Sequence, residues 1–143
     1  MKTAISIGSA YYNGEDWDQL VEYTKAADRL GVSQAWSAEA WGMDAIVPLA
    51  YLAGQTENIH LGTGILQISS RVPSMIAMTA QSLDTVSNGR FILGLGVSGP
   101  QVVEGLHGAA FAKPLSRLRE VVEILHIGLK GEKLAYDGDH YLL

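Results

Sequence analysis

Cysteine is absent from this chain of 143 residues, and charged side chains are scarce. The lack of cysteine excludes disulfide bonds, thiolate nucleophiles and sulfur-based metal sites, although it leaves the compartment open. Charged residues make up 17% of the sequence, the net charge is −5, and no basic cluster occurs. A nucleic-acid partner is therefore not expected.

Long apolar runs are also missing. The longest, AIVPLAYLAG, has about half the length that a membrane-spanning helix needs. The opening residues, MKTAISIGSAYYNGED, carry one lysine and a very short apolar run before glycine and acidic residues, which is not typical of a signal peptide. We therefore expect a soluble, cytoplasmic protein without a membrane partner.

Short apolar segments alternate regularly with amphipathic ones. The expected strands cover residues 3–8, 33–39, 58–68 and 90–96, and the expected helices cover 15–31, 44–56, 73–87 and 114–130. Asp44 is placed to cap the second helix, while Gly31 and the pair Asn88-Gly89 are placed to end the first and third. Residues 132–143 are typical of a strand, an Asp-Gly turn and a short extended end.

This alternation predicts an α/β fold with a parallel sheet covered by helices. Two architectures fit it, an open doubly wound sheet or part of a (β/α)8 TIM barrel. Four βα units would be half of such a barrel, that is, (β/α)4. No linker or low-complexity segment interrupts the pattern, so residues 1–143 are expected to form a single domain.

The stretch HLGTGILQI, residues 60–68, is a buried strand with glycine at its centre. Glycine weakens a strand interior and usually marks a bulge or a close approach of another backbone. Gly62 and Gly64 therefore predict an interruption of the third strand.

The segment GLGVSG, Gly94–Gly99, matches the G-x-G-x-x-G pattern of dinucleotide-binding folds, and Glu120 follows at a fitting distance. Three features weaken this interpretation. The motif is on the fourth strand, Pro100 follows its last glycine, and Glu120 lies inside an amphipathic helix. The alternatives are a flexible loop, or glycines that let a ligand approach the backbone at the strand's C-terminal end.

Other candidate residues are isolated. Glu39 follows the second strand, where it could accept a hydrogen bond from a ligand or be solvated beside the helix cap Asp44. Arg71 follows the third strand, where it could meet an anion or be solvated. No nucleophile elbow or Walker loop occurs. The histidines show no metal-binding spacing: His60, His107, His126 and His140.

Several segments together resemble the bacterial-luciferase-like superfamily, and most of all its coenzyme F420-dependent oxidoreductase branch. They are AEAWGMDA, IHLGTGILQI, LDTVSNGRFILGLGVSGPQVVEGLHG and KPLSRLREVVEIL, in the family's order and spacing over essentially the whole chain. Each motif alone is weak, but the ordered set is fairly specific. The resemblance implies a (β/α)8 barrel of which this chain holds the N-terminal half.

The resemblance also implies a cofactor site. In the family a bulge with a non-prolyl cis peptide in the third strand backs a flavin or deazaflavin ring, and here that bond would be Gly64–Ile65. An ordinary trans bulge is the alternative. The implied cofactor is F420, with FMN as the alternative, and the implied reaction is hydride transfer at ring carbon C5 to or from a small organic substrate. The implied cofactor-binding residues are Glu39, Gly64, Ile65, Gln67, Val97, Ser98 and Gly99.

Two departures from the family pattern matter. Ala40 stands where luciferases and a sugar-phosphate dehydrogenase branch carry a histidine, so a histidine-assisted mechanism is not expected at that position. We assign no catalytic residue, and His107 is only a candidate proton donor. The family's strands five to eight are absent, so the sheet would have open edges. We therefore expect a homo-oligomer that pairs through them.

Three classes of function remain open at this point. The first is an F420-dependent oxidoreductase or its N-terminal half, with an FMN-dependent luciferase-like monooxygenase as its variant. The second is a non-catalytic half-barrel. The third is an NAD(P)-binding domain built on Gly94–Gly99.

Overall fold

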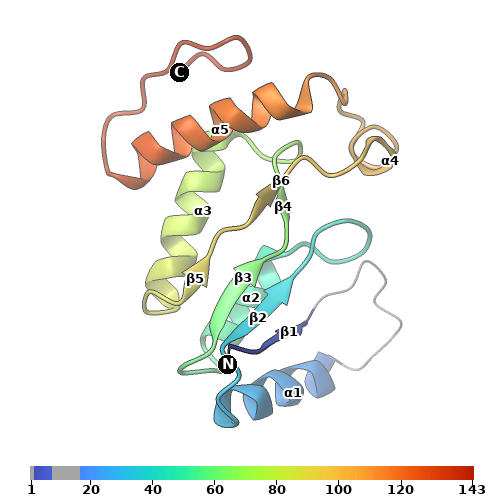
Figure 1. Cartoon of the computed structure of the whole chain (residues 1–143), viewed down its shortest axis with the longest axis vertical. Coiled ribbons are helices and arrows are strands. Elements are labelled where there is room, and N and C mark those ends of the chain that lie inside the picture. The colour runs from blue at the N-terminus through green and yellow to red at the C-terminus, as the bar shows by residue number, and fades with distance from the viewer. Residues whose placement is uncertain (1, 8–16) are drawn as a thin grey trace. The chain divides into compact units, whose positions relative to one another are not determined.

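The computed structural model describes residues 2–7 and 17–143, in which strands and helices alternate along the chain (Figure 1). The elements are β1 (Ala4–Ser6), α1 (Trp17–Arg29), β2 (Gln34–Ser37), α2 (Ile46–Ala53), β3 (His60–Thr63), β4 (Leu66–Gln67), α3 (Pro73–Val86), β5 (Phe91–Ile92), β6 (Leu95–Gly96), α4 (Pro100–Val103) and α5 (Pro114–Leu129). The predicted α/β class with a parallel sheet is confirmed.

The described chain divides into two compact units. The first unit comprises the residues up to Leu66 together with Ser82–Leu95, and the second comprises Gln67–Gln81 together with Gly96–Leu143. The single domain expected over residues 1–143 stays a prediction.

The first unit is built on a four-stranded parallel sheet in the order β1-β2-β3-β5. Its register pairs Ala35 of β2 with Leu61 of β3, and both side chains are fully buried. Leu49 and Leu52 of α2 and Val21 of α1 pack in the same apolar core. The strands are therefore fixed by burial of continuous apolar segments against helices.

Helix ends follow the local signals of the sequence. Gly31 has a φ of 77°, and Val32 N–H bonds to the Ala27 carbonyl at 3.0 Å, which is the Schellman arrangement. Asn88, with a φ of 55°, ends α3 in the same way. Asp44 Oδ1 accepts the N–H groups of residues 46 and 47 at 2.8 and 3.0 Å. The three predicted caps are confirmed.

Two predicted strands are split. The third becomes β3 and β4, and the fourth becomes β5 and β6. At the break Thr63 Oγ1 accepts the N–H of Gly94 and donates to its carbonyl, both at 2.9 Å. A Cβ on Gly94 would lie 2.0 Å from the Thr63 carbonyl oxygen, and a Cβ on Gly62 would lie 2.6 Å from the Trp36 ring. The interruption predicted at Gly62 and Gly64 is confirmed, although the close neighbour of Gly62 is a side chain and not another backbone. At Gly94 the Thr63 hydroxyl adds to the backbone bond that the Gly94 carbonyl accepts from Leu66 N–H at 2.8 Å.

The second unit contains α5, whose buried face includes Val121, Ile124 and Leu125. The end of the chain differs from the expectation. An antiparallel bridge joins Asp137 to Leu142, and Gly138 N–H bonds to the Tyr141 carbonyl at 3.0 Å. The turn therefore lies after the Asp137-Gly138 pair. The carboxylate of Glu120, on α5, accepts the backbone N–H groups of residues 139–141 and so holds the turn there.

Among the described residues, no helix is both long and apolar enough to cross a membrane. The cytoplasmic location stays a prediction.

Candidate functional site

Glu39, Gly64 and Ile65 lie in the first unit, where β2 and β3 end. The Gly64–Ile65 bond is cis, as the family resemblance implied. Gly64 N–H bonds to the Ser37 carbonyl at 2.7 Å, which ties the break in the third strand to the end of β2. Glu39 is only 8% exposed, so the alternative of a solvated carboxylate is wrong, although Asp44 does cap its helix. These residues share the C-terminal end of a parallel sheet, where such folds place their sites.

Gln67, Val97, Ser98 and Gly99 lie in the second unit, where β4 and β6 end. Gln67 is fully buried, and its side-chain Oε1 accepts a hydrogen bond from Ser69 Oγ at 2.9 Å. Its Nε2 lies 2.6 Å from His107 Nε2. Ser98 has a φ of 58°, a left-handed conformation that is uncommon for serine and is found at ligand-binding positions.

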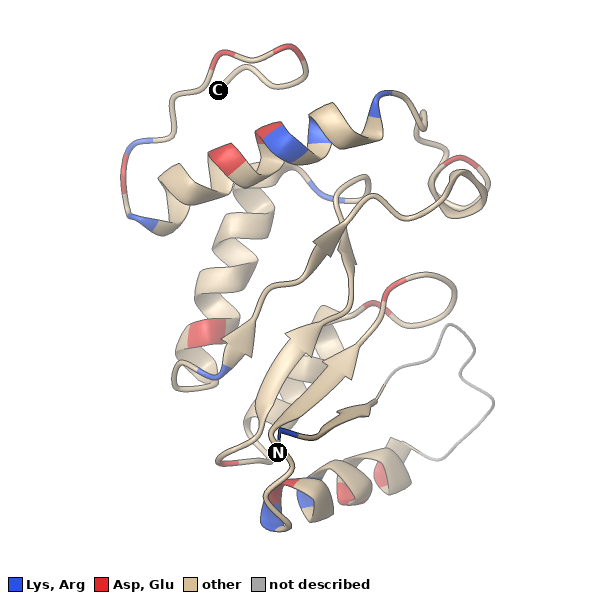
Figure 2. Ribbon diagram, in the orientation of Figure 1, with Lys and Arg blue, Asp and Glu red and all other residues tan. Residues whose placement is uncertain are grey.

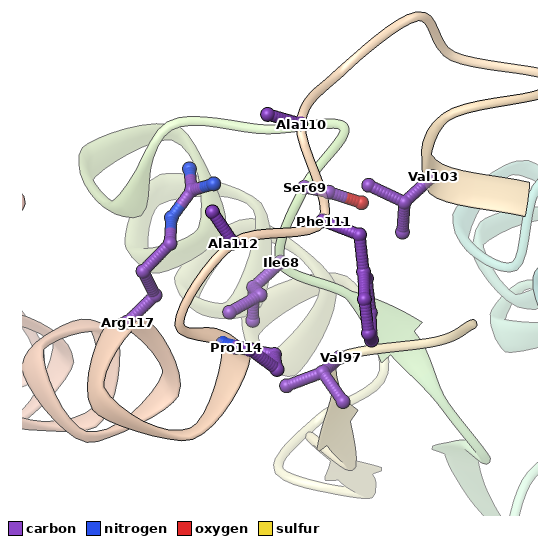
Figure 3. A pocket seen from close by; sticks show the side chains of 9 residues that line it. All are labelled: Ile68, Ser69, Val97, Val103, Ala110, Phe111, Ala112, Pro114 and Arg117. Carbon is purple, nitrogen blue, oxygen red and sulfur yellow. The ribbon is translucent and has the colours of Figure 1, made fainter. Parts of the chain in front are cut away.

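A hollow in the second unit is lined by residues that follow β4 and β6, by the end of α4 and the segment after it, and by the start of α5. Figure 3 shows the Phe111 ring reaching toward Val97, with Ser69 beside Val103 at the other end of the ring. The lining is apolar except for Ser69 and Arg117. The hollow encloses about 10 Å³, close to the space that one water needs. It is therefore too small to enclose a cofactor ring by itself.

Two arginines of the second unit, Arg117 and Arg71, are candidates for binding an anion, but each already donates a hydrogen bond to a hydroxyl group. Arg117 Nη2 donates to the Tyr141 hydroxyl at 3.5 Å, and its guanidinium lies 5.9 Å from the centre of that ring. Arg71 donates to Ser70 Oγ at 3.1 Å. Figure 2 shows that charged residues lie on helices and loops, whereas the strands carry none. Nothing in this arrangement builds a strong anion site.

The dinucleotide fingerprint over Gly94–Gly99 is wrong. Gly94 is required by its contact with Thr63, and the helix after Gly99 is α4, which has only four residues. Glu120 lies within helix α5 and not at the end of a strand, where the fingerprint needs its acidic residue. Its carboxylate accepts the backbone N–H groups of residues 139–141 at 2.9–3.1 Å.

No metal site is present in the part of the chain that the structure describes, since no three potential ligands gather. Two of the histidines have side-chain partners. His140 Nε2 lies 2.7 Å from Ser116 Oγ, and His107 contacts Gln67. Sequence reasoning missed the contact between Gln67 and His107 because the two residues are 40 positions apart. The only signal was local: Gln67 and Ser69 are polar at alternate positions of a buried strand end.

Comparisons with known proteins agree with the fold. Residues 1–143 match the model of a family described as luciferase-like monooxygenase. A protein of Mycobacterium tuberculosis, named as a proposed coenzyme F420-dependent oxidoreductase, is 42% identical over 144 residues, which cover this whole chain and 41% of the relative. The chain thus spans about two fifths of the length of that relative.

Two solved structures superpose closely on the chain. The coenzyme F420-dependent tetrahydromethanopterin reductase of Methanopyrus kandleri has a TM-score of 0.86 at 23% identity, covering 99% of this chain and 44% of its own. The oxygenating part of 3,6-diketocamphane monooxygenase of Pseudomonas putida, in complex with FMN, has a TM-score of 0.87 at 20% identity, covering 100% and 43%. The predicted half of a TIM barrel is confirmed.

Proposed function

The chain belongs to the luciferase-like monooxygenase family, and from this premise we propose that it serves a coenzyme F420-dependent oxidoreductase, as its N-terminal half. The reaction would be hydride transfer between the deazaflavin and a small organic substrate. The observation that carries this proposal is the 42% identity, over the whole chain, to a relative named for F420.

The residues present fit a deazaflavin. Such a ring has an apolar face and a polar edge of carbonyl and N–H groups. Gly64 and Ile65, in the first unit, would offer backbone and apolar surface to the face of such a ring, and Glu39 of the same unit would offer a carboxylate. The implied roles of Gln67 and the segment Val97–Gly99 in cofactor binding stay a prediction. When bound, F420 supplies hydride transfer at C5; the chain's part is to back the ring, orient it and keep water away.

A parallel titration with F420, FMN and NADPH, followed by the fluorescence of each, tests this proposal. Saturable F420 binding is the expected result. A preference for FMN would move the chain to a flavin-dependent monooxygenase, and binding of NADPH alone would contradict both. No binding would favour the second candidate, a non-catalytic half-barrel.

Open sheet edges support a further proposal, that the chain forms a homo-oligomer. In the four-stranded sheet, β1 and β5 each pair on one side only. Unpaired edges favour association, and a closed barrel removes them. In a longer protein, additional strands of the same chain would cover these edges instead.

A further inference from the structure

Gln67 is a polar side chain in a fully buried position, at the end of β4. Buried amides are almost always hydrogen-bonded at both ends. Here Ser69 Oγ donates to Oε1 at 2.9 Å, and Nε2 faces His107 Nε2 at 2.6 Å. A continuous line of hydrogen bonds therefore runs from Ser69 through Gln67 to His107, all within the second unit.

The chemistry of these groups fixes the state of the imidazole. An amide NH2 donates and does not accept, so His107 Nε2 must be the unprotonated acceptor. The single proton of the neutral ring is then on Nδ1. Ser69 Oγ donates to the oxygen end of this amide, so the NH2 end is the one that faces the ring.

The segment around His107 does not need the imidazole contact to hold its shape. The backbone N–H of His107 bonds to the Val102 carbonyl at 3.1 Å, and Phe111 N–H bonds to Glu104 Oε1 at 3.0 Å. His107 is exposed, and within the described residues its Nδ1 has no partner. A buried amide thus orients an exposed ring whose N–H remains available.

We propose that Ser69 and Gln67 hold His107 as the neutral Nδ1–H tautomer, and that this N–H donates a hydrogen bond to a carbonyl oxygen on the polar edge of the bound cofactor ring. The identity of the ring rests on the proposed function. Gln67 and Ser69 are positioning residues, and His107 is the group that touches the ligand. A neutral imidazole held in one tautomer is a known way to polarise a carbonyl.

The first measurement reads the tautomer without any ligand. The chain carries ¹⁵N-labelled histidine, and long-range ¹H–¹⁵N correlation is recorded at about pH 8, where ordinary imidazoles are neutral. The His107 signal is assigned by its loss in His107→Gln. We expect the Nδ1–H pattern in the wild type, a switch to Nε2–H in Gln67→Glu, whose carboxylate only accepts, and a mixture in Ser69→Ala. An Nε2–H pattern in the wild type would overturn the inference.

The second measurement reads the ligand contact. F420 is titrated against the wild type, His107→Ala and His126→Ala, the last being an exposed histidine on α5 that serves as the matched control. Loss of one hydrogen bond should weaken F420 binding about five- to tenfold in His107→Ala and leave it unchanged in His126→Ala. Bound F420 should also shift the Nδ1 resonance of the wild type.

The two measurements separate the possible failures. F420 binding with equal affinity in the wild type and His107→Ala would overturn the ligand contact while leaving the proposed function intact. Absence of binding by both F420 and FMN would contradict the proposed function and the ligand contact in this chain. The tautomer experiment would still decide whether Gln67 positions the ring.

Discussion

At the scale of single residues, Asp28 illustrates how a buried carboxylate serves a neighbouring segment. It accepts the backbone N–H groups of Glu57, Asn58 and Ile59 at 2.7–3.0 Å. Burial raises its pKa, but these three N–H groups, together with Arg90, outweigh burial and hold the pKa below its ordinary value. Since the folded pKa lies below the unfolded one, the stabilisation is present above about pH 4 and is lost as the pH falls through the folded pKa.

Asp28→Asn should therefore lower the free energy of unfolding at neutral pH by about 1–3 kcal/mol, because one amide oxygen cannot serve three donors. The variant should also lose part of the acid dependence of stability. Urea unfolding at several pH values measures both effects. Glu22→Gln is the control, because Glu22 is an exposed partner of Lys25 and such pairs contribute little. Equal acid sensitivity of the wild type and Asp28→Asn would contradict this account.

Gly94 offers a second test at the same scale. A Cβ there would lie 2.0 Å from the Thr63 carbonyl oxygen, a backbone atom that cannot move aside cheaply. Gly94→Ala should cost about 1–3 kcal/mol by overpacking, and it should disturb the two hydrogen bonds between Thr63 and Gly94. Chemical denaturation measures the cost.

Gly54→Ala is the matched control for Gly94→Ala. Gly54 has a φ of −82°, and its added Cβ would meet only the Tyr51 carbonyl oxygen at 3.6 Å. Alanine fits this conformation, so the variant should be neutral or more stable by up to about 1 kcal/mol. Comparable destabilisation by the two substitutions would show that the close approach at Gly94 is not the cause of the lost stability.

At the scale of elements, the end of the chain is fastened to α5 by two carboxylates. Glu120 accepts the N–H groups of Asp139, His140 and Tyr141, and Tyr136 donates its hydroxyl to Glu123. That hydrogen bond to Glu123, aided by burial and nearby acidic charge, raises the pKa of Tyr136 to about 12. Glu120 therefore holds the backbone of residues 139–141, whereas Glu123 holds only the side chain of Tyr136.

Glu120→Gln should free the backbone of residues 139–141, because an amide has only one accepting oxygen. We expect hydrogen exchange of these amides to accelerate about tenfold or more, with little change elsewhere. Glu123→Gln is the control: it should leave these amides protected but bring the pKa of Tyr136 back toward its ordinary value of 10.0, as read by ultraviolet titration. Unchanged hydrogen exchange in Glu120→Gln would show that the bonds from residues 139–141 to Glu120 do not protect these amides.

At the scale of the whole molecule, sequence reasoning succeeded where the signal is local. The alternation of strands and helices, the helix ends at Gly31 and Asn88 and the cap at Asp44 each depend on a few neighbouring residues. The cis bond at Gly64–Ile65 was expected only from the family resemblance. Helix α4 was missed because four residues are too few to show a helical period.

Long-range contacts set the limit of that reasoning. The pairing of Gln67 with His107 joins residues 40 positions apart, and that of Thr63 with Gly94 joins residues 31 apart. Neither leaves a trace in local periodicity, because the fold alone brings the partners together. The candidate site was therefore predicted as a set of strand-end residues, while the hydrogen bonds that connect some of them were not.

The last prediction concerns the open edge of the sheet. Ile7 N–H bonds to the Trp36 carbonyl, so alternation along the parallel pair turns the N–H of Ala4 away from β2. Proline is tolerated on an edge strand when its missing N–H faces outward. Ala4→Pro should therefore leave the fold intact but weaken association of the 15.3-kDa chain about tenfold. Ala4→Val, which keeps the N–H, is the control. Light scattering over a concentration series measures the effect, and a wild-type chain that stays monomeric throughout would exclude pairing through this edge.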